Sequence, residues 1–151
     1  MSARITPELP PPLAHYLAQG APALLLTAGA DGYATSMYTW AVGLDSKRVR
    51  FAVDADSSGL ANLRRSGLAS LHIIGPGGLE FLVKGTARPL KDRLEAAGDA
   101  PMLVYEMAVV GAKDQSWPGV ESAPLRYLWP EDTRDAMSRM EQSVYAEMRA
   151  A

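Results

Sequence analysis

The stretch that decides the fold runs from Phe51 to Ala87. It reads Phe51-Ala52-Val53-Asp54-Ala55-Asp56-Ser57-Ser58-Gly59-Leu60-Ala61-Asn62-Leu63-Arg64-Arg65-Ser66-Gly67, then Leu68–Ile74, the turn Gly75–Gly78, and a segment that ends Val83-Lys84-Gly85-Thr86-Ala87. Charged and apolar residues alternate from Arg48 to Phe51, which is typical of a half-buried strand. Leu60–Arg65 fits a short helix that ends at Gly67. The pattern therefore predicts a strand, a short helix, and two strands joined by a glycine turn.

The residues before this stretch predict more strands of the same kind. Ala23–Thr27 is apolar and is followed by Gly29–Gly32, whose Asp-Gly pair is typical of a hairpin turn. Tyr33–Leu44 continues as a long strand, and Leu13–Gln19 fits a short helix. Five strands in the first ninety residues, joined mostly by tight turns, favour antiparallel pairing and closure into a small barrel.

The residues after Leu90 are expected to be more helical. The sequence predicts helices over Lys91–Ala97 and Pro101–Val110, and a short aromatic strand over Leu125–Trp129 as the sixth of the sheet. Pro130 can open a last helix, about residues 131–149, in which apolar residues recur at helical spacing to form a stripe: Met137, Met140, Val144 and Met148. We expect one domain over 1–151, with a barrel core at about 21–90 plus the strand near 125–129.

Composition excludes several classes of protein. The 151 residues contain no cysteine and two distant histidines, so neither disulfides nor a zinc site are expected. The net charge is −2 and no basic stripe is present, which argues against a nucleic-acid partner. No apolar stretch is long enough to cross a membrane, and Met1–Pro12 lacks the apolar core of a signal peptide. A cytoplasmic location is therefore expected.

The familiar catalytic motifs are missing from the sequence. There is no Gly-x-Ser-x-Gly elbow, no Walker loop, and no Gly-x-Gly-x-x-Gly after a strand. Gly75–Gly78 joins two strands, so it lacks the helix dipole that would hold a phosphate. His72 falls on a strand and is expected to face outward as a surface residue. No side chain is assigned a catalytic role.

The order of elements from Phe51 to Ala87 resembles the pyridoxamine 5′-phosphate oxidase-like superfamily. In that family a strand ends in a Ser-containing loop, a short helix carries an Asn-Leu pair, and a later strand has a Val-x-Gly-x-Ala pattern. The resemblance covers about Ala14 to Leu90. It implies a mainly β fold with flanking helices, a six-stranded antiparallel split β-barrel. It also implies a homodimer that binds FMN at the subunit interface, and flavin-dependent oxidoreductase activity on a small molecule.

Carried onto this chain, the resemblance puts the flavin phosphate near Asp54–Asn62. The loop offers hydroxyl donors and the free N–H groups of a helix start. The predicted cofactor-binding residues are Tyr38, Thr39, Trp40, Val53, Ser57, Ser58, Asn62 and Lys84. Two simpler interpretations stay open. In the first, Ser57–Gly59 serves only as a helix cap; in the second, Tyr38–Trp40 are packing residues of a barrel strand.

The chain departs from the family pattern where the phosphate is bound. Gly59 stands where the family usually has Lys or Arg, and Met37 and Val42 stand where basic residues are often found. Each lost charge-assisted contact weakens anion binding by roughly 1.5–3 kcal/mol. The alternatives are therefore a non-catalytic split-barrel dimer that has lost tight flavin binding, or a deazaflavin or haem binder in the same cleft.

Overall fold

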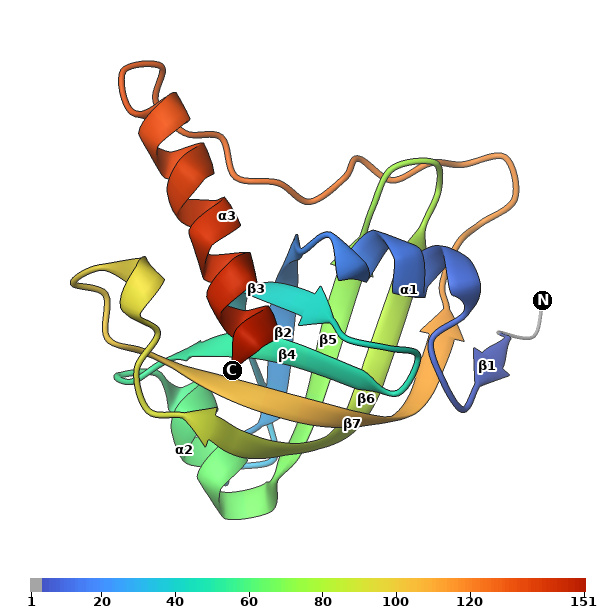
Figure 1. Ribbon diagram of the computed structural model, residues 1–151. Helices are drawn as coiled ribbons and strands as arrows, with labels where there is room; N and C mark the ends of the chain where they lie inside the picture. The colour runs from blue at the N-terminus through green and yellow to red at the C-terminus, as the bar shows by residue number, and fades with distance from the viewer. Residues whose placement is uncertain (1–3) are drawn as a thin grey trace.

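The fold is a closed barrel of six antiparallel strands, and the computed structural model describes residues 4–151 of it. The strands are β2 (Ala21–Ala28), β3 (Ala34–Gly43), β4 (Arg48–Asp54), β5 (Leu68–Ile74), β6 (Glu80–Lys91) and β7 (Met102–Asp114) (Figure 1). Their order is β7-β4-β3-β2-β5-β6, and β6 pairs back onto β7. The short β1 (Ile5–Thr6) adds to the end of β7. The predicted six-stranded split barrel with flanking helices is confirmed.

Alternation along each strand separates the barrel interior from its outer surface. In β2, Ala23 and Leu25 are buried, whereas Leu24 and Leu26 are only partly covered. The interior is filled by apolar side chains from all six strands, among them Leu25, Phe51, Leu71, Val83 and Met107.

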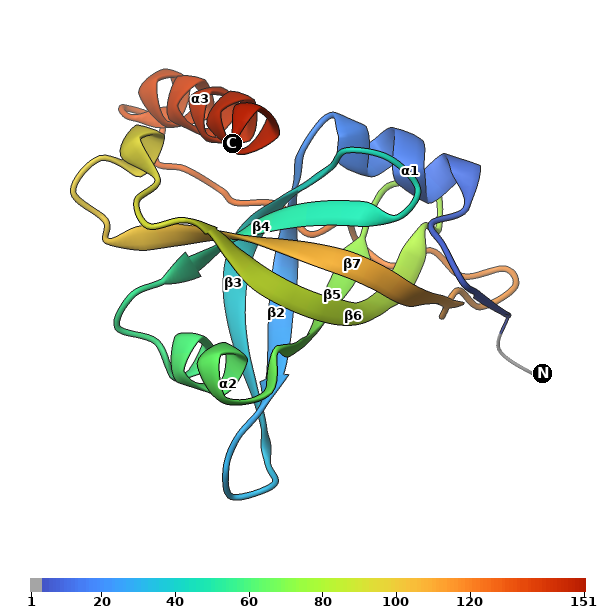
Figure 2. The same cartoon turned by 60° about the horizontal axis from the view of Figure 1, so that its bottom comes forward.

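Two short helices pack against the barrel from different sides. The helix α1 (Pro11–Ala18) contributes Leu13 and Leu17 to the core, and α2 (Ser58–Ser66) contributes Leu60 and Leu63. Figure 2 shows them at opposite ends of the barrel, with the β2–β3 hairpin projecting beyond α2. The αL conformation of Gly67 ends α2, as predicted for that glycine.

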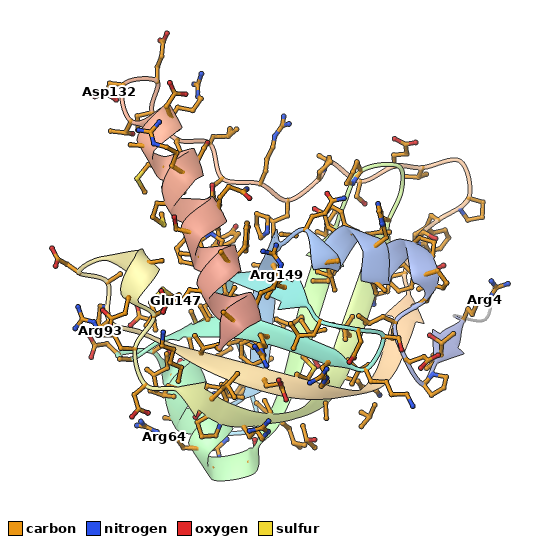
Figure 3. The ribbon with its side chains drawn as sticks, viewed as in Figure 1. Arg4, Arg64, Arg93, Asp132, Glu147 and Arg149 are labelled. Atoms are coloured by element: carbon orange, nitrogen blue, oxygen red, sulfur yellow. The ribbon has the colours of Figure 1, made fainter. Side chains whose placement is uncertain are left out.

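The last helix, α3 (Arg134–Ala150), covers the outer surface of β3 and β4 beside the 3-10 turn η1 (Glu95–Ala97). A second apolar cluster joins it to the barrel and includes Val42, Val104, Val144 and Met148. Figure 3 shows Glu147 and Arg149 near the end of α3 that lies on the barrel. No helix in the described part of the chain is both long and apolar enough to span a membrane.

The two helices predicted after Leu90 are wrong. β6 continues to Lys91, only Glu95–Ala97 is helical, and Met102–Asp114 is a strand. The reason is that β7 is buried on both sides: Leu103 faces the interior, and Val104 lies in the cluster beneath α3. A strand that is buried on both sides has a nearly continuous run of apolar residues. Its sequence lacks the alternation of a half-buried strand and therefore cannot be distinguished from that of a buried helix by periodicity.

The strand predicted over Leu125–Trp129 is also wrong. The sixth strand is β7, and because β6 and β7 pair with each other, no free edge remains for another strand in that position. Residues 115–133 instead cross the surface as an irregular segment, which we call the strap. The helix begins at Arg134 because residues 130–133 form a turn, with the Thr133 N–H donating to the Pro130 carbonyl.

Candidate functional site

The outer face of β2, β5, β6 and the first half of β3 lies away from α3, which covers the second half of β3 and β4. Cross-strand pairing aligns its side chains in two rows. We call this surface the open face and define it by Ser36, Leu26, Ser70 and Lys84 in one row, and Tyr38, Leu24, His72 and Leu82 in the other. The open face combines three leucines and Tyr38 with two serines, Lys84 and His72, and it is the surface on which a ligand or a partner can lie.

A cleft of about 420 Å³ lies at one end of the open face. Its walls come from β2, the β2–β3 hairpin, β5, β6 and β7, and its lining is Leu26, Thr27, Ala28, Gly32, Ala34, Leu68, Ala69, Ser70, Lys84, Gly85, Thr86 and Val110. The volume falls in the range of small-molecule sites. The lining is chiefly apolar, with hydroxyls and one ammonium group at the β5–β6 side.

A β-bulge shapes the wall of the cleft on β7. Lys84 pairs with Gly111 and Gly85 pairs with Val109, so Val110 is an extra residue between them and its side chain is 59% exposed. A Cβ at Gly85 would lie 2.1 Å from the carbonyl oxygen of Ala108, so only glycine fits there. The register shift after Lys84 and the close approach of the Ala108 carbonyl to Gly85 together form the bulge.

The start of α2, where the resemblance places the phosphate, forms hydrogen bonds within the protein. The Ser57 hydroxyl donates to the Asp54 carbonyl at 2.7 Å and accepts from the Leu60 N–H at 3.2 Å. Ser57 is therefore the N-cap of α2. Gly59 is buried, and a Cβ there would lie 3.6 Å from the Met37 sulfur. Position 59 is thus bordered by the Ser57 hydroxyl, Met37 and Leu25 at ordinary contact distances, while Ser58 is exposed.

Asn62 supports the cleft from behind. Its amide donates to Thr27 Oγ1 at 3.1 Å and to Thr35 Oγ1 at 3.3 Å, and its Oδ1 accepts from Arg65 at 3.1 Å. Arg65 also donates to the Ala28 carbonyl. Because Thr27 and Ala28 line the cleft, α2 positions one cleft wall through these two side chains.

Tyr38, Thr39 and Trp40 point to different sides of β3. Thr39 is buried, and its hydroxyl donates to the Ala52 carbonyl at 2.6 Å. Tyr38 is exposed on the open face, with its ring edge-on to Tyr127 of the strap at 6.3 Å between centroids. Trp40 also meets Tyr127 edge-on, at 6.1 Å.

Glu141 of α3 fastens the strap to the barrel, a role that the sequence did not suggest. Its two carboxylate oxygens accept from the indole N–H groups of Trp40 at 3.0 Å and Trp129 at 2.7 Å. The Tyr127 hydroxyl donates to the Thr39 carbonyl at 2.9 Å. Burial, together with the charge of Glu141, raises the pKa of Tyr127 to about 12.

A buried ion triad holds the other end of α3. Arg50 Nε lies 3.0 Å from Glu106 Oε2, and the exposed Arg88 lies 2.9 Å from Glu106 Oε1. Arg50 also donates to the last carbonyls of α3, on Met148 and Arg149, at 2.9 Å each. Burial opposes the charge of Glu106, but the two guanidinium groups outweigh it and hold the pKa of Glu106 below its usual range.

Of the eight predicted cofactor-binding residues, Lys84 is the one in the cleft lining. Tyr38 shares the open face, and Trp40 contacts α3 and the strap. Thr39 and Val53 are buried, and Ser57, Ser58 and Asn62 belong to α2 or its cap. His72 is half-buried between Leu24 and Leu82, and its Nε2 has no hydrogen-bond partner among residues 4–151. Val110 and Ser70 were missed; the run of apolar residues from Met102 to Val110 hid the bulge.

Comparison with known proteins finds likeness in structure alone. No family model matches the chain, and no curated protein matches it in sequence. A solved structure described as an F420 reductase is 16% identical, with a TM-score of 0.60 over 71% of this chain and 100% of its own. A candidate pyridoxamine 5′-phosphate oxidase from Lactobacillus delbrueckii is 17% identical, with a TM-score of 0.59 over 74% and 98%. HupZ from Group A Streptococcus is 17% identical, with a TM-score of 0.53 over 68% and 90%.

These matches agree with the closed antiparallel barrel described above. The resemblance seen in the sequence is thereby confirmed at the level of the fold: the chain has the split-barrel architecture of pyridoxamine 5′-phosphate oxidase-like proteins. Function must be argued from the cleft, because one fold carries many activities.

Proposed function

We propose that the chain binds a flavin-type cofactor in the cleft on the open face, with FMN as the first candidate, and acts as a flavin-dependent oxidoreductase. The observation that carries this proposal is the cleft itself. It is of ligand size, its walls are apolar, and Lys84, Ser70 and Thr86 lie together along one side. Apolar walls with a few convergent polar groups are the usual form of a cofactor site.

The cleft lining fits the flat, apolar body of an isoalloxazine. Leu26, Leu68 and Val110 can cover a ring face and exclude water. The ammonium group of Lys84 supplies positive charge on the β5–β6 side of the cleft, which favours a ligand that carries an anionic group. When bound, a flavin supplies the electron transfer, so no side-chain nucleophile is required.

The proposed active form is a homodimer. Leu68 and Val110 border the cleft and are 58% and 59% exposed, so a large part of the cleft wall is apolar and faces solvent. A second copy on the open face would cover these side chains and close the cleft, and two-fold symmetry would give two equivalent sites. A cytoplasmic location remains part of the proposal.

A second candidate function is a non-catalytic split-barrel binder. The hydrogen bonds of Ser57 favour it, because the loop that should hold the flavin phosphate already caps α2. The F420 reductase likeness makes a deazaflavin the next ligand to test, and haem is tested as the third ligand that the sequence left open.

The test is a titration of the purified protein with FMN, followed by quenching of flavin fluorescence. We expect saturable binding, weaker than in split barrels with a cation at the Gly59 position. Parallel titrations with a deazaflavin and with haem, the latter followed by its Soret band, identify the preferred ligand. A protein that is purified colourless and binds no FMN at millimolar concentration contradicts the flavin proposal.

A further inference from the structure

The polar side of the cleft contains one cation among residues 4–151, which is Lys84. Its side chain lies over Gly111, whose missing Cβ would be 3.5 Å from Lys84 Cε. Glycine at 111 therefore leaves room for the lysine stem along the outer surface of β7. Ser70 pairs directly with Lys84 across β5 and β6, and Thr86 lies on the same face of β6 two residues further on. An ammonium group and two hydroxyls thus gather at the β5–β6 side.

The start of α2 has no comparable set of groups. The Ser57 hydroxyl has both a donor and an acceptor partner, Gly59 carries no cation, and Asp54 and Asp56 add negative charge beside them. An anion placed there would meet two carboxylates and no cation from that loop, and none of these residues lines the cleft. The electrostatics favour the β5–β6 side of the cleft, because charge-assisted hydrogen bonds are the strong ones.

We propose that the phosphate of the bound flavin lies at the β5–β6 side of the cleft, against Lys84, Ser70 and Thr86, and not at the start of α2. This inference rests on the proposed flavin function and goes beyond it, because it moves the anion-binding part of the site to different elements. Lys84 is then the residue that makes the protein prefer a phosphorylated flavin to a neutral one.

The preference is measured by comparing FMN with riboflavin, which differs from it by the phosphate alone. For the wild-type protein we expect FMN to bind about 5- to 10-fold more tightly than riboflavin, the size expected for one partly exposed charge-assisted contact. The advantage should shrink as salt is added, since salt screens exposed charges. Both dissociation constants are obtained from flavin fluorescence, without any assay of activity.

The decisive variant is Lys84→Met, which keeps the length of the side chain and removes its charge. FMN should then bind only as tightly as riboflavin, with riboflavin affinity unchanged, and Lys84→Arg should retain the preference. Lys113→Met is the matched control, because Lys113 lies on the neighbouring strand, opposite Leu82, and outside the cleft lining. Thermal unfolding of each variant shows that the fold is intact.

The outcomes separate this inference from the proposed function. If neither flavin binds to the wild-type protein, both are wrong. If riboflavin and FMN bind but Lys84→Met weakens them equally, or Lys113→Met has the same effect as Lys84→Met, then Lys84 does not hold the phosphate, although the flavin function stands. If Ser57→Ala removes the preference and Lys84→Met does not, the phosphate lies at α2.

Discussion

At the scale of single residues, two glycines in the segment that decided the fold have opposite roles. Gly59 lies in α2 with ordinary space around it: a Cβ would meet its three nearest neighbours at 3.5–3.9 Å. Gly85 lies at the bulge, where a Cβ would be 2.1 Å from the Ala108 carbonyl oxygen. The sequence shows only that both residues are glycine. The contacts around each position distinguish the replaceable glycine from the obligatory one.

This difference predicts opposite effects of the same substitution. Gly59→Ala should raise the free energy of unfolding by about 0.5–1 kcal/mol, because alanine restricts the unfolded chain and favours the helix. Gly85→Ala should lower it by about 2 kcal/mol or more, because β6 and β7 must move apart. Denaturant unfolding of the two variants measures both changes. Equal effects of the same sign would contradict the packing described at the bulge.

At the scale of elements, α3 is joined to the barrel by polar contacts along its length. Arg50 donates to the carbonyls at its C-terminus, and Glu141 accepts from two indoles nearer its start. Glu147 accepts from the N–H groups of Glu95 and Ala96 and lies 2.7 Å from Lys91 Nζ. Burial opposes its charge, but these partners outweigh burial and keep its pKa low. The helix is therefore fixed at one position on β3 and β4.

The ion triad at Glu106 gives the protein a predictable dependence on acid. The pKa of Glu106 is lower in the folded state than in the unfolded chain, so the unfolded chain binds more protons as the pH falls below about 4.3. The stabilisation by Glu106 is complete above that pH and is lost as the pH falls through the folded-state pKa.

Glu106→Gln should cost about 3 kcal/mol of unfolding free energy at pH 7, because it leaves the buried Arg50 without its counter-charge. The cost should shrink at pH 3, because the unfolded wild-type chain binds a proton at Glu106 there and the wild-type protein loses part of this stabilisation. Denaturant unfolding at the two pH values measures this. Glu95→Gln is the control: its pair with Arg93 is exposed and should contribute at most about 1 kcal/mol at either pH. A Glu106→Gln cost that is the same at both pH values would show that its charge is not what stabilises α3.

The elements that the sequence predicted correctly are those with a local cause. The Asp31-Gly32 turn, the cap at Gly67 and the alternation of β4 each depend on residues close together in the chain. The errors concern residues whose surroundings come from far away. β7 looked helical because α3 covers its outer side, and Leu125–Trp129 looked like a strand although β6 had already closed the barrel.

The candidate site was harder to predict for the same reason. Lys84 belonged to the predicted set, but Ser70 and Val110 join it only through the pairing of β5, β6 and β7. From the sequence, Ser57 could be either a phosphate-binding hydroxyl or a helix cap. Its hydrogen bond from the Leu60 N–H shows that it caps α2. That the residues named from the resemblance contact a flavin stays a prediction, which the titrations test.

At the scale of the whole molecule, the barrel has one covered side and one open side. The helix α3 covers the outer surface at β3 and β4, and the lower half of its apolar stripe, Val144 and Met148, is buried in this contact. That part of the stripe is not available to a partner. Large apolar side chains stay exposed at the border of the cleft, on the open face, on the strap and at two other places: Leu68 and Val110; Tyr38; Trp117, Val120 and Leu128; and Ile5 and Tyr33.

The open face therefore predicts where a dimer forms. We expect a homodimer of two 16.2 kDa chains at micromolar concentration in sedimentation experiments. Leu68→Lys should produce a monomer, because a charge at the centre of an apolar interface is desolvated without a partner and costs several kcal/mol. Leu128→Lys is the matched control, since Leu128 is 83% exposed on the strap and outside the open face. Because Leu68 also lines the cleft, the dependence of FMN binding on the dimer is measured on the wild-type protein, whose affinity for FMN should fall when dilution produces monomers. Leu128→Lys should leave both dimer formation and FMN binding unchanged. A wild-type protein that sediments as a monomer would remove the shared cleft, and FMN binding would then have to be explained by one chain alone.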